Sequence, residues 1–204
     1  MEPSKFYELI GRFCIEFEQV SSWMEDIFQE LLEKERVSRP DEISGLPNKH
    51  INKSLVQLVS EKIRILGASK IGAEPAAAAK PVLAAFSKLA ELRNFLLHTK
   101  WIAPHQDPSF RRSGDVVVGR NIGIGRRKPG ATLYPALEID QLERAVAACA
   151  EVDSLVAFLV YGVSRGKLPE GCLPDLIAHA EHVERDITSL ISSIKIKPLP
   201  SQDP

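Results

Sequence analysis

One apolar stripe near the start of the chain constrains the fold more than any other feature. Apolar side chains recur at steps of three and four over residues 4–36, which is the spacing of one buried face on an amphipathic helix. They are Phe6, Leu9, Ile10, Phe13, Phe17, Val20, Met24, Ile27, Phe28, Leu31 and Leu32. At roughly 1.5 Å per residue, this helix is longer than a compact domain needs. We expect its end to project, to kink or to pack on a second subunit.

Four later segments are also predicted to be helical, separated by stretches that contain glycine and proline. Their expected ranges are 51–66, 80–98, 140–163 and 173–194. Pro81 suits the first turn of the helix that begins near Lys80. The stretch 68–79, which includes Gly72, Pro75 and an alanine run, is predicted to be a loose connector or a short helix.

The segment 99–139 has a different pattern, in which short apolar runs are separated by glycine and proline. This pattern predicts two or three short strands inserted between helices. The expected fold class is therefore all-α, an up-and-down helical bundle with a short β-hairpin insertion at 99–139. We expect one domain over residues 1–196 and a flexible tail over 197–204.

Composition excludes several classes of protein. The formal net charge is −1, so the chain has no overall positive field that would attract nucleic acid or membrane. Three widely spaced cysteines, Cys14, Cys149 and Cys172, favour a reducing compartment and lack zinc-ligand spacing. No signal peptide is recognisable, and no apolar stretch approaches the roughly 20 residues of a membrane span. A cytoplasmic location without membrane contact is the default expectation.

The helix that ends near His98 carries the most informative motif, Arg93-Asn94-Phe95-Leu96-Leu97-His98. Asn94 and His98 are four residues apart and so share one helix face. Arg93 is offset by about 100°, but its long side chain can bend toward the same place. The helix end is therefore predicted to present arginine, asparagine and histidine together.

This motif resembles the signature of the HEPN superfamily, in which an arginine, often followed by a polar residue, precedes a histidine by four to six residues. The match covers six residues, and the helical organisation is similar over most of the chain. The β-like insertion is a departure from the minimal HEPN bundle. The resemblance implies a metal-independent endoribonuclease, built at a two-fold homodimer interface and used in toxin–antitoxin or phage-defence systems. A neutralising antitoxin protein is a further partner that it implies.

The implied chemistry assigns a role to each residue of the motif. His98 would act as general acid or base on the ribose 2′-OH and the leaving 5′-oxygen. Arg93 would hold the scissile phosphate, while Asn94 would orient His98 or bind a phosphate oxygen. Under the simpler interpretation, Arg93 and Asn94 form local caps or ion pairs, and His98 complements the helix dipole. A non-catalytic module that binds RNA or a protein partner is the alternative function.

A basic cluster within the insertion is the second candidate site. Its members are Arg111, Arg112, Arg120, Arg126, Arg127 and Lys128. With Trp101 and Phe110 available for stacking, it could bind an RNA backbone and deliver the strand to His98. A solvated loop is the competing interpretation.

Other patterns favour structural roles. His179 and His182 could share a metal on one helix face, but no third ligand is evident, so a solvated face is preferred. Glu16 and Glu18 are likewise expected on an exposed face of the first helix. We expect no cofactor and no bound metal.

Overall fold

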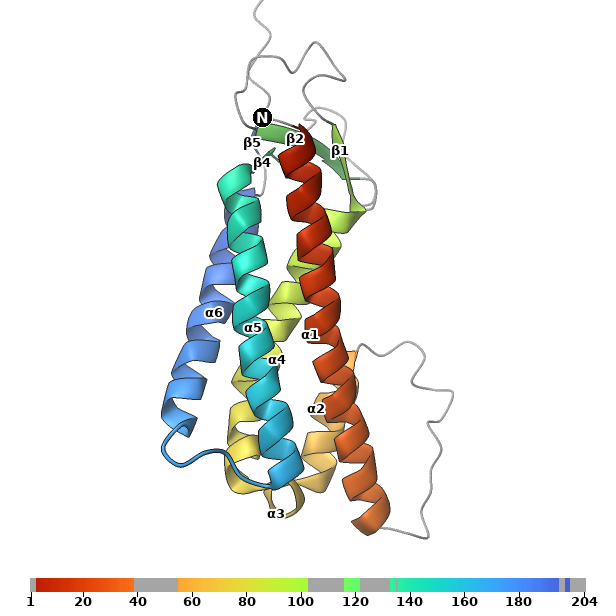
Figure 1. Cartoon of the computed structure of the whole chain (residues 1–204), viewed down its shortest axis with the longest axis vertical. Helices are drawn as coiled ribbons and strands as arrows, with labels where there is room; N and C mark the ends of the chain where they lie inside the picture. The colour runs from red at the N-terminus through yellow and green to blue at the C-terminus, as the bar shows by residue number, and fades with distance from the viewer. Residues whose placement is uncertain are drawn as a thin grey trace, which may run out of the picture.

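The computed structural model describes residues 3–38, 55–102, 116–121, 133–134, 136–194 and 197–198, and it is mostly helical (Figure 1). The helices are α1 (Pro3–Ser38), α2 (Leu55–Leu66), α3 (Ala68–Ile71), α4 (Ala73–His98), α5 (Ile139–Arg165) and α6 (Leu173–Ile194). The strands are β1 (Thr99–Ile102), β2 (Val116–Asn121), β3 (Leu133–Tyr134), β4 (Ala136–Glu138) and β5 (Lys197–Pro198).

Helix α1 confirms the long first helix, and α6 has the predicted bounds of 173–194. The buried positions of α1 include Phe6, Phe13, Val20 and Leu31, which follow the apolar stripe of the sequence. Burial of each large apolar side chain stabilises the fold by roughly 1.5–3 kcal/mol. Packing of this stripe, rather than helix propensity alone, therefore holds α1 in place.

Helix α4 begins at Ala73, earlier than the predicted start near Lys80, so Pro81 lies inside the helix and not in its first turn. The alanine run 76–79 favours the helix strongly. The start is also held by a tertiary contact, because the Leu168 N–H donates to Glu74 Oε2 at 3.0 Å. These contributions outweigh the backbone hydrogen bond that Pro81 cannot make.

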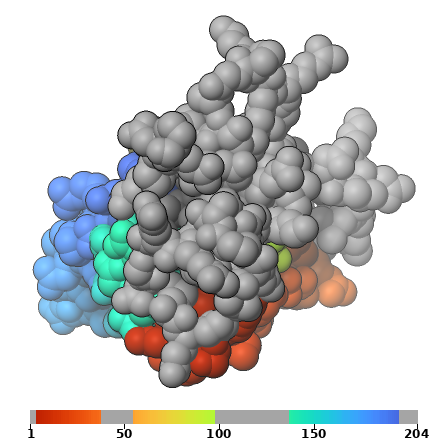
Figure 2. Space-filling model, turned by 90° about the horizontal axis from the view of Figure 1, so that it is seen from above, coloured from red at the N-terminus to blue at the C-terminus, as the bar shows by residue number. Residues whose placement is uncertain are grey.

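Helices α1 and α5 run in the same direction, and α4 and α6 run in the opposite one (Figure 1). Two surface contacts connect the parallel pair: Lys5 Nζ lies 2.8 Å from Glu143 Oε1 near one end, and Lys34 Nζ donates to the Ser164 carbonyl near the other. Seen from the end that carries the sheet, α5 begins between α1 and α6 (Figure 2). Helix α2 packs on α1 and α4, and Lys62 forms an ion pair there with Glu35.

The strands β1, β2 and β4 form an antiparallel sheet in that order, at the end of the bundle where α4 ends and α5 begins (Figure 1). The register places Lys100 opposite Arg120 and Val117 opposite Leu137. Three described strands of the predicted insertion thus form one sheet, larger than one hairpin, and β3 of the same segment belongs to a second sheet. Leu137 is fully buried and connects this sheet to the core of the bundle.

The tail predicted at 197–204 includes a short strand, since β5 pairs with β3. Lys197 lies opposite Tyr134 in this two-stranded sheet. The remaining tail residues lie outside the described part of the chain.

The expectation that no segment is long and apolar enough to span a membrane was wrong. By length and composition α5 qualifies, with a mean hydropathy of 1.8 over its most apolar window. Core helices of bundles share this composition, and α5 contacts α1, α4 and α6. Its inner face includes Leu142, Val152 and Leu159, all fully buried.

Candidate functional site

The last three turns of α4 position the predicted arginine and asparagine. Leu89, Leu92 and Leu96 recur at steps of three and four and are fully or almost fully buried. Because these leucines set the inward face, the helix turn places Arg93 at the edge of the core and Asn94 in solvent. Arg93 is accordingly half-buried, and Asn94 is exposed.

An aromatic stack holds the guanidinium group of Arg93. Its Cζ atom lies 5.7 Å from the centroid of the Phe17 ring on α1, within the range of a cation–π contact. Phe17 is itself stacked on Phe86 of α4 at 6.1 Å and on Phe13 at 6.3 Å, between ring centroids. Arg93 therefore rests on a rigid apolar platform that joins α1 to α4.

Arg93 and Asn94 contact each other directly. The Arg93 Nη1 atom donates to Asn94 Oδ1 at 3.2 Å. Within the described part of the chain, the buried Nε of Arg93 has no hydrogen-bond partner, and no carboxylate forms an ion pair with this guanidinium. A half-buried charge without a counter-charge is costly, so this group is suited to receive an anion.

His98 is the last residue of α4, so the structure confirms that the motif ends with the helix. Its side chain lies outside the described residues. The structure thus brings Arg93 and Asn94 together, and the position of the imidazole beside them remains a prediction from helix periodicity.

The basic cluster falls almost entirely outside the described residues. Arg120 belongs to β2, where its backbone is paired with Lys100 of β1, and its side chain is not described. The remaining members, Arg111, Arg112, Arg126, Arg127 and Lys128, lie in the undescribed stretches that flank β2.

His179 and His182 contact different carboxylates. The Nε2 of His179 lies 2.8 Å from Glu151 of α5, and that of His182 lies 3.3 Å from Asp186 of α6. Both imidazoles are exposed, as predicted for a solvated face. No cluster of three metal-ligating side chains occurs among the residues that the structure describes.

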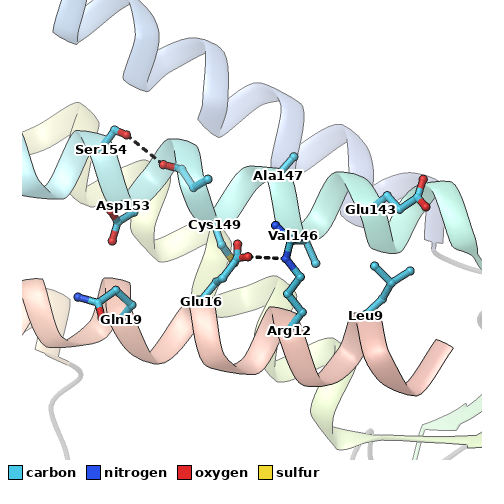
Figure 3. Close-up of a pocket in the computed structure, with 11 residues that line it drawn as sticks. Leu9, Arg12, Glu16, Gln19, Glu143, Val146, Ala147, Cys149, Asp153 and Ser154 are labelled. Atoms are coloured by element: carbon cyan, nitrogen blue, oxygen red, sulfur yellow. Dashed lines mark hydrogen bonds and ion pairs between the residues drawn. The ribbon is translucent and has the colours of Figure 1, made fainter. Parts of the chain in front are cut away.

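A groove between α1 and α5 was not anticipated from the sequence (Figure 3). We call it the α1–α5 groove; its volume is about 590 Å³. It is lined by Leu9, Arg12, Glu16 and Gln19 of α1 and by Glu143, Val146, Ala147, Cys149, Ala150, Asp153 and Ser154 of α5. Glu16 was expected on an exposed face but is half-buried here, where it lines the groove and pairs with Arg12; Glu18 is exposed as expected.

The floor of the α1–α5 groove is apolar, and nearby carboxylates give it a negative electrostatic potential. Cys149 is fully buried, and its pKa is raised to about 12. Burial is the largest cause, and the negative charges of Glu16 and Asp153 add to it together with Cys14. In the sequence, the feature that could have indicated this groove is the pair Cys149 and Asp153. These two residues are four apart and interrupt the apolar stripe of α5.

Comparisons with known proteins provide no assignment of function. No protein family matches the chain, and the searches of curated proteins and of solved structures find no match either.

Proposed function

We propose that the chain is a metal-independent endoribonuclease of the HEPN type, with Arg93, Asn94 and His98 in the catalytic site. The observation that supports this proposal is the environment of the Arg93 guanidinium. Its guanidinium is half-buried and fixed on Phe17, and it has no carboxylate partner among the described residues. Such a cation fits an anionic substrate group, and a phosphodiester is the anion that the motif implies.

The helix arrangement is compatible with the proposed HEPN-like bundle. Helices α1, α4, α5 and α6 alternate in direction along the chain, and the motif lies at the end of α4. The platform of Phe17 and Phe86 restrains the arginine before substrate arrives, which reduces the cost of ordering it during catalysis.

The proposed reaction is an internal transfer at phosphorus. The ribose 2′-oxygen attacks the neighbouring phosphate, and the bond to the 5′-oxygen breaks. One His98 removes the proton from the 2′-OH, and a second histidine protonates the leaving 5′-oxygen. Arg93 offsets the charge that develops on the phosphate oxygens, and the product ends in a 2′,3′-cyclic phosphate.

The two proton transfers are the reason to propose a homodimer. One chain contributes a single His98, whereas two chains related by a two-fold axis bring two histidines and two arginines to one site. RNA is the proposed substrate, and an antitoxin protein is a proposed partner. A cytoplasmic location belongs to the same proposal.

The experiment is an RNA-cleavage assay in EDTA with wild type and His98→Ala. The proposal expects cleavage by wild type and its loss in the variant, with the oligomeric state unchanged. His182→Ala is the matched control, because His182 is exposed on α6 and pairs with Asp186 away from the motif. Cleavage that continues unchanged in His98→Ala refutes the catalytic role. Salt-sensitive RNA binding without cleavage by wild type would instead favour the non-catalytic alternative.

A further inference from the structure

The α1–α5 groove has the size and the mixed lining of a small-molecule site. Its volume of about 590 Å³ lies inside the range of roughly 300–1,000 Å³ that is typical of ligand pockets. One stretch of its wall is apolar and formed by Val146, Ala147 and Ala150 of α5. The small alanines leave open the space that larger side chains would have filled.

The carboxylates of the groove differ in whether they form an ion pair with a basic side chain. Glu16 is paired with Arg12 at 2.7 Å, and Glu143 is paired with Lys5 at 2.8 Å. Asp153 forms no ion pair within the described part of the chain. Its Oδ1 atom is buried and has no hydrogen-bond donor there. A half-buried carboxylate that has no counter-charge, and one oxygen of which has no donor, is costly to the fold, and a cation beside it offsets that cost.

The carboxylate group of Asp153 lines the groove, where a ligand can contact it. Asp153 extends from α5 toward α1, across from Gln19, at one end of the groove (Figure 3). The apolar stretch from Val146 to Ala150 begins one turn from Asp153. The raised pKa of Cys149 on the floor is consistent with this arrangement, because part of it comes from the charges of Glu16 and Asp153.

We propose that the α1–α5 groove binds a small organic cation with an aliphatic arm. The ammonium or guanidinium group contacts Asp153 and the side-chain oxygen of Gln19. The arm lies over Ala150, Ala147 and Val146. This site lies between α1 and α5, whereas Arg93 belongs to α4, so the proposal is independent of the nuclease assignment.

Isothermal titration calorimetry on the full chain tests the site, with spermidine as the ammonium probe and agmatine as the guanidinium probe. Saturable binding of at least one cation is expected, and an uncharged alkane diol should not bind. Asp153→Asn should weaken binding by about tenfold or more, because it removes a charge-assisted hydrogen bond. Ala150→Leu fills the groove and should abolish binding while leaving Asp153 in place.

Glu151→Gln is the matched control, since it removes one negative charge from α5 at a residue that faces His179 of α6 instead of the groove. Thermal denaturation shows that each variant is folded. The proposal is overturned if neither cation binds at millimolar concentration, or if Asp153→Asn and Glu151→Gln weaken binding equally. It is also overturned if the diol binds as tightly as the cations, or if only an oligo-lysine peptide binds.

Discussion

The guanidinium of Arg93 lies over the ring of Phe17, 5.7 Å from its centroid, and this contact joins the motif of α4 to α1. The same ring stacks on Phe13, whereas the cation–π contact of Arg93 within the described part of the chain is with Phe17. Phe17 is therefore expected to position the arginine, in addition to filling the core. The two phenylalanines form a matched pair that separates these roles.

Phe17→Leu should lower kcat/KM for RNA cleavage by about fivefold or more, because a partly buried cation–π contact is worth about 1 kcal/mol or more. Phe13→Leu should destabilise the fold about as much as Phe17→Leu does, since Phe13 is fully buried. It should nevertheless leave kcat/KM nearly unchanged. Cleavage kinetics and thermal denaturation of both variants provide the measurement. Equal losses of kcat/KM in the two variants would contradict a positioning role.

Arg93→Met should abolish cleavage without lowering the free energy of unfolding. Methionine retains the contact with Phe17 and removes a half-buried charge that no carboxylate offsets in the described part of the chain. We expect a stability equal to that of wild type or up to about 1 kcal/mol greater, which is a common trade-off at functional sites.

Arg12→Met is the control for that prediction. Arg12 is paired with Glu16 one turn away, so its replacement should cost about 0.3–0.5 kcal/mol. Urea denaturation of both variants tests the contrast. If Arg93→Met is clearly less stable than Arg12→Met, Arg93 is a structural residue and the argument for an anion site fails.

Periodicity located most of the helices because each buries one continuous apolar stripe. It failed at the start of α4, where Pro81 suggested a first turn. The alanine run and the contact from Glu74 to Leu168 instead extend the helix backward to Ala73. Local rules cannot include a hydrogen bond between segments so distant in sequence.

The candidate sites also combine features that local sequence determines with features that depend on contacts between distant segments. The adjacency of Arg93 and Asn94 follows from their neighbouring positions on one helix. The platform of Phe17 and the α1–α5 groove require the pairing of helices that are far apart in sequence. In the sequence, Glu16 belongs to a helix with many charged residues, and only the parallel packing of α5 turns it into a wall of the groove.

Gly72→Ala should destabilise the fold by about 3 kcal/mol or more. Gly72 joins α3 to α4 with a φ of +94°, where side chains are strained, and an added Cβ would overlap the carbonyl oxygen of Gly166. Gly11→Ala is the opposite control, because nothing lies within 4 Å of a Cβ at that position in α1. It should stabilise the fold by about 0.5–1 kcal/mol. Denaturation midpoints that shift in the same direction would contradict this account.

The buried thiol of Cys149 should make the fold less stable at alkaline pH. Its pKa is about 12 in the folded chain and near 9.0 in the unfolded one. Between these values the unfolded chain releases the proton and the folded chain retains it, so stability falls as pH rises. The slope is about 1.4 kcal/mol per pH unit above pH 9 for this one group, and its contribution is fully present below pH 9.

The difference in unfolding free energy between wild type and Cys149→Ala isolates this effect from the lysines and tyrosines that titrate in the same range. The cavity left by the substitution lowers stability equally at every pH, whereas titration of the thiol lowers the stability of wild type only above pH 9. The gap between the two proteins should therefore narrow steadily from pH 9 to pH 11 in urea titrations. A constant gap would mean that the thiol titrates in the folded chain as it does in the unfolded one, contrary to its burial beside Glu16 and Asp153.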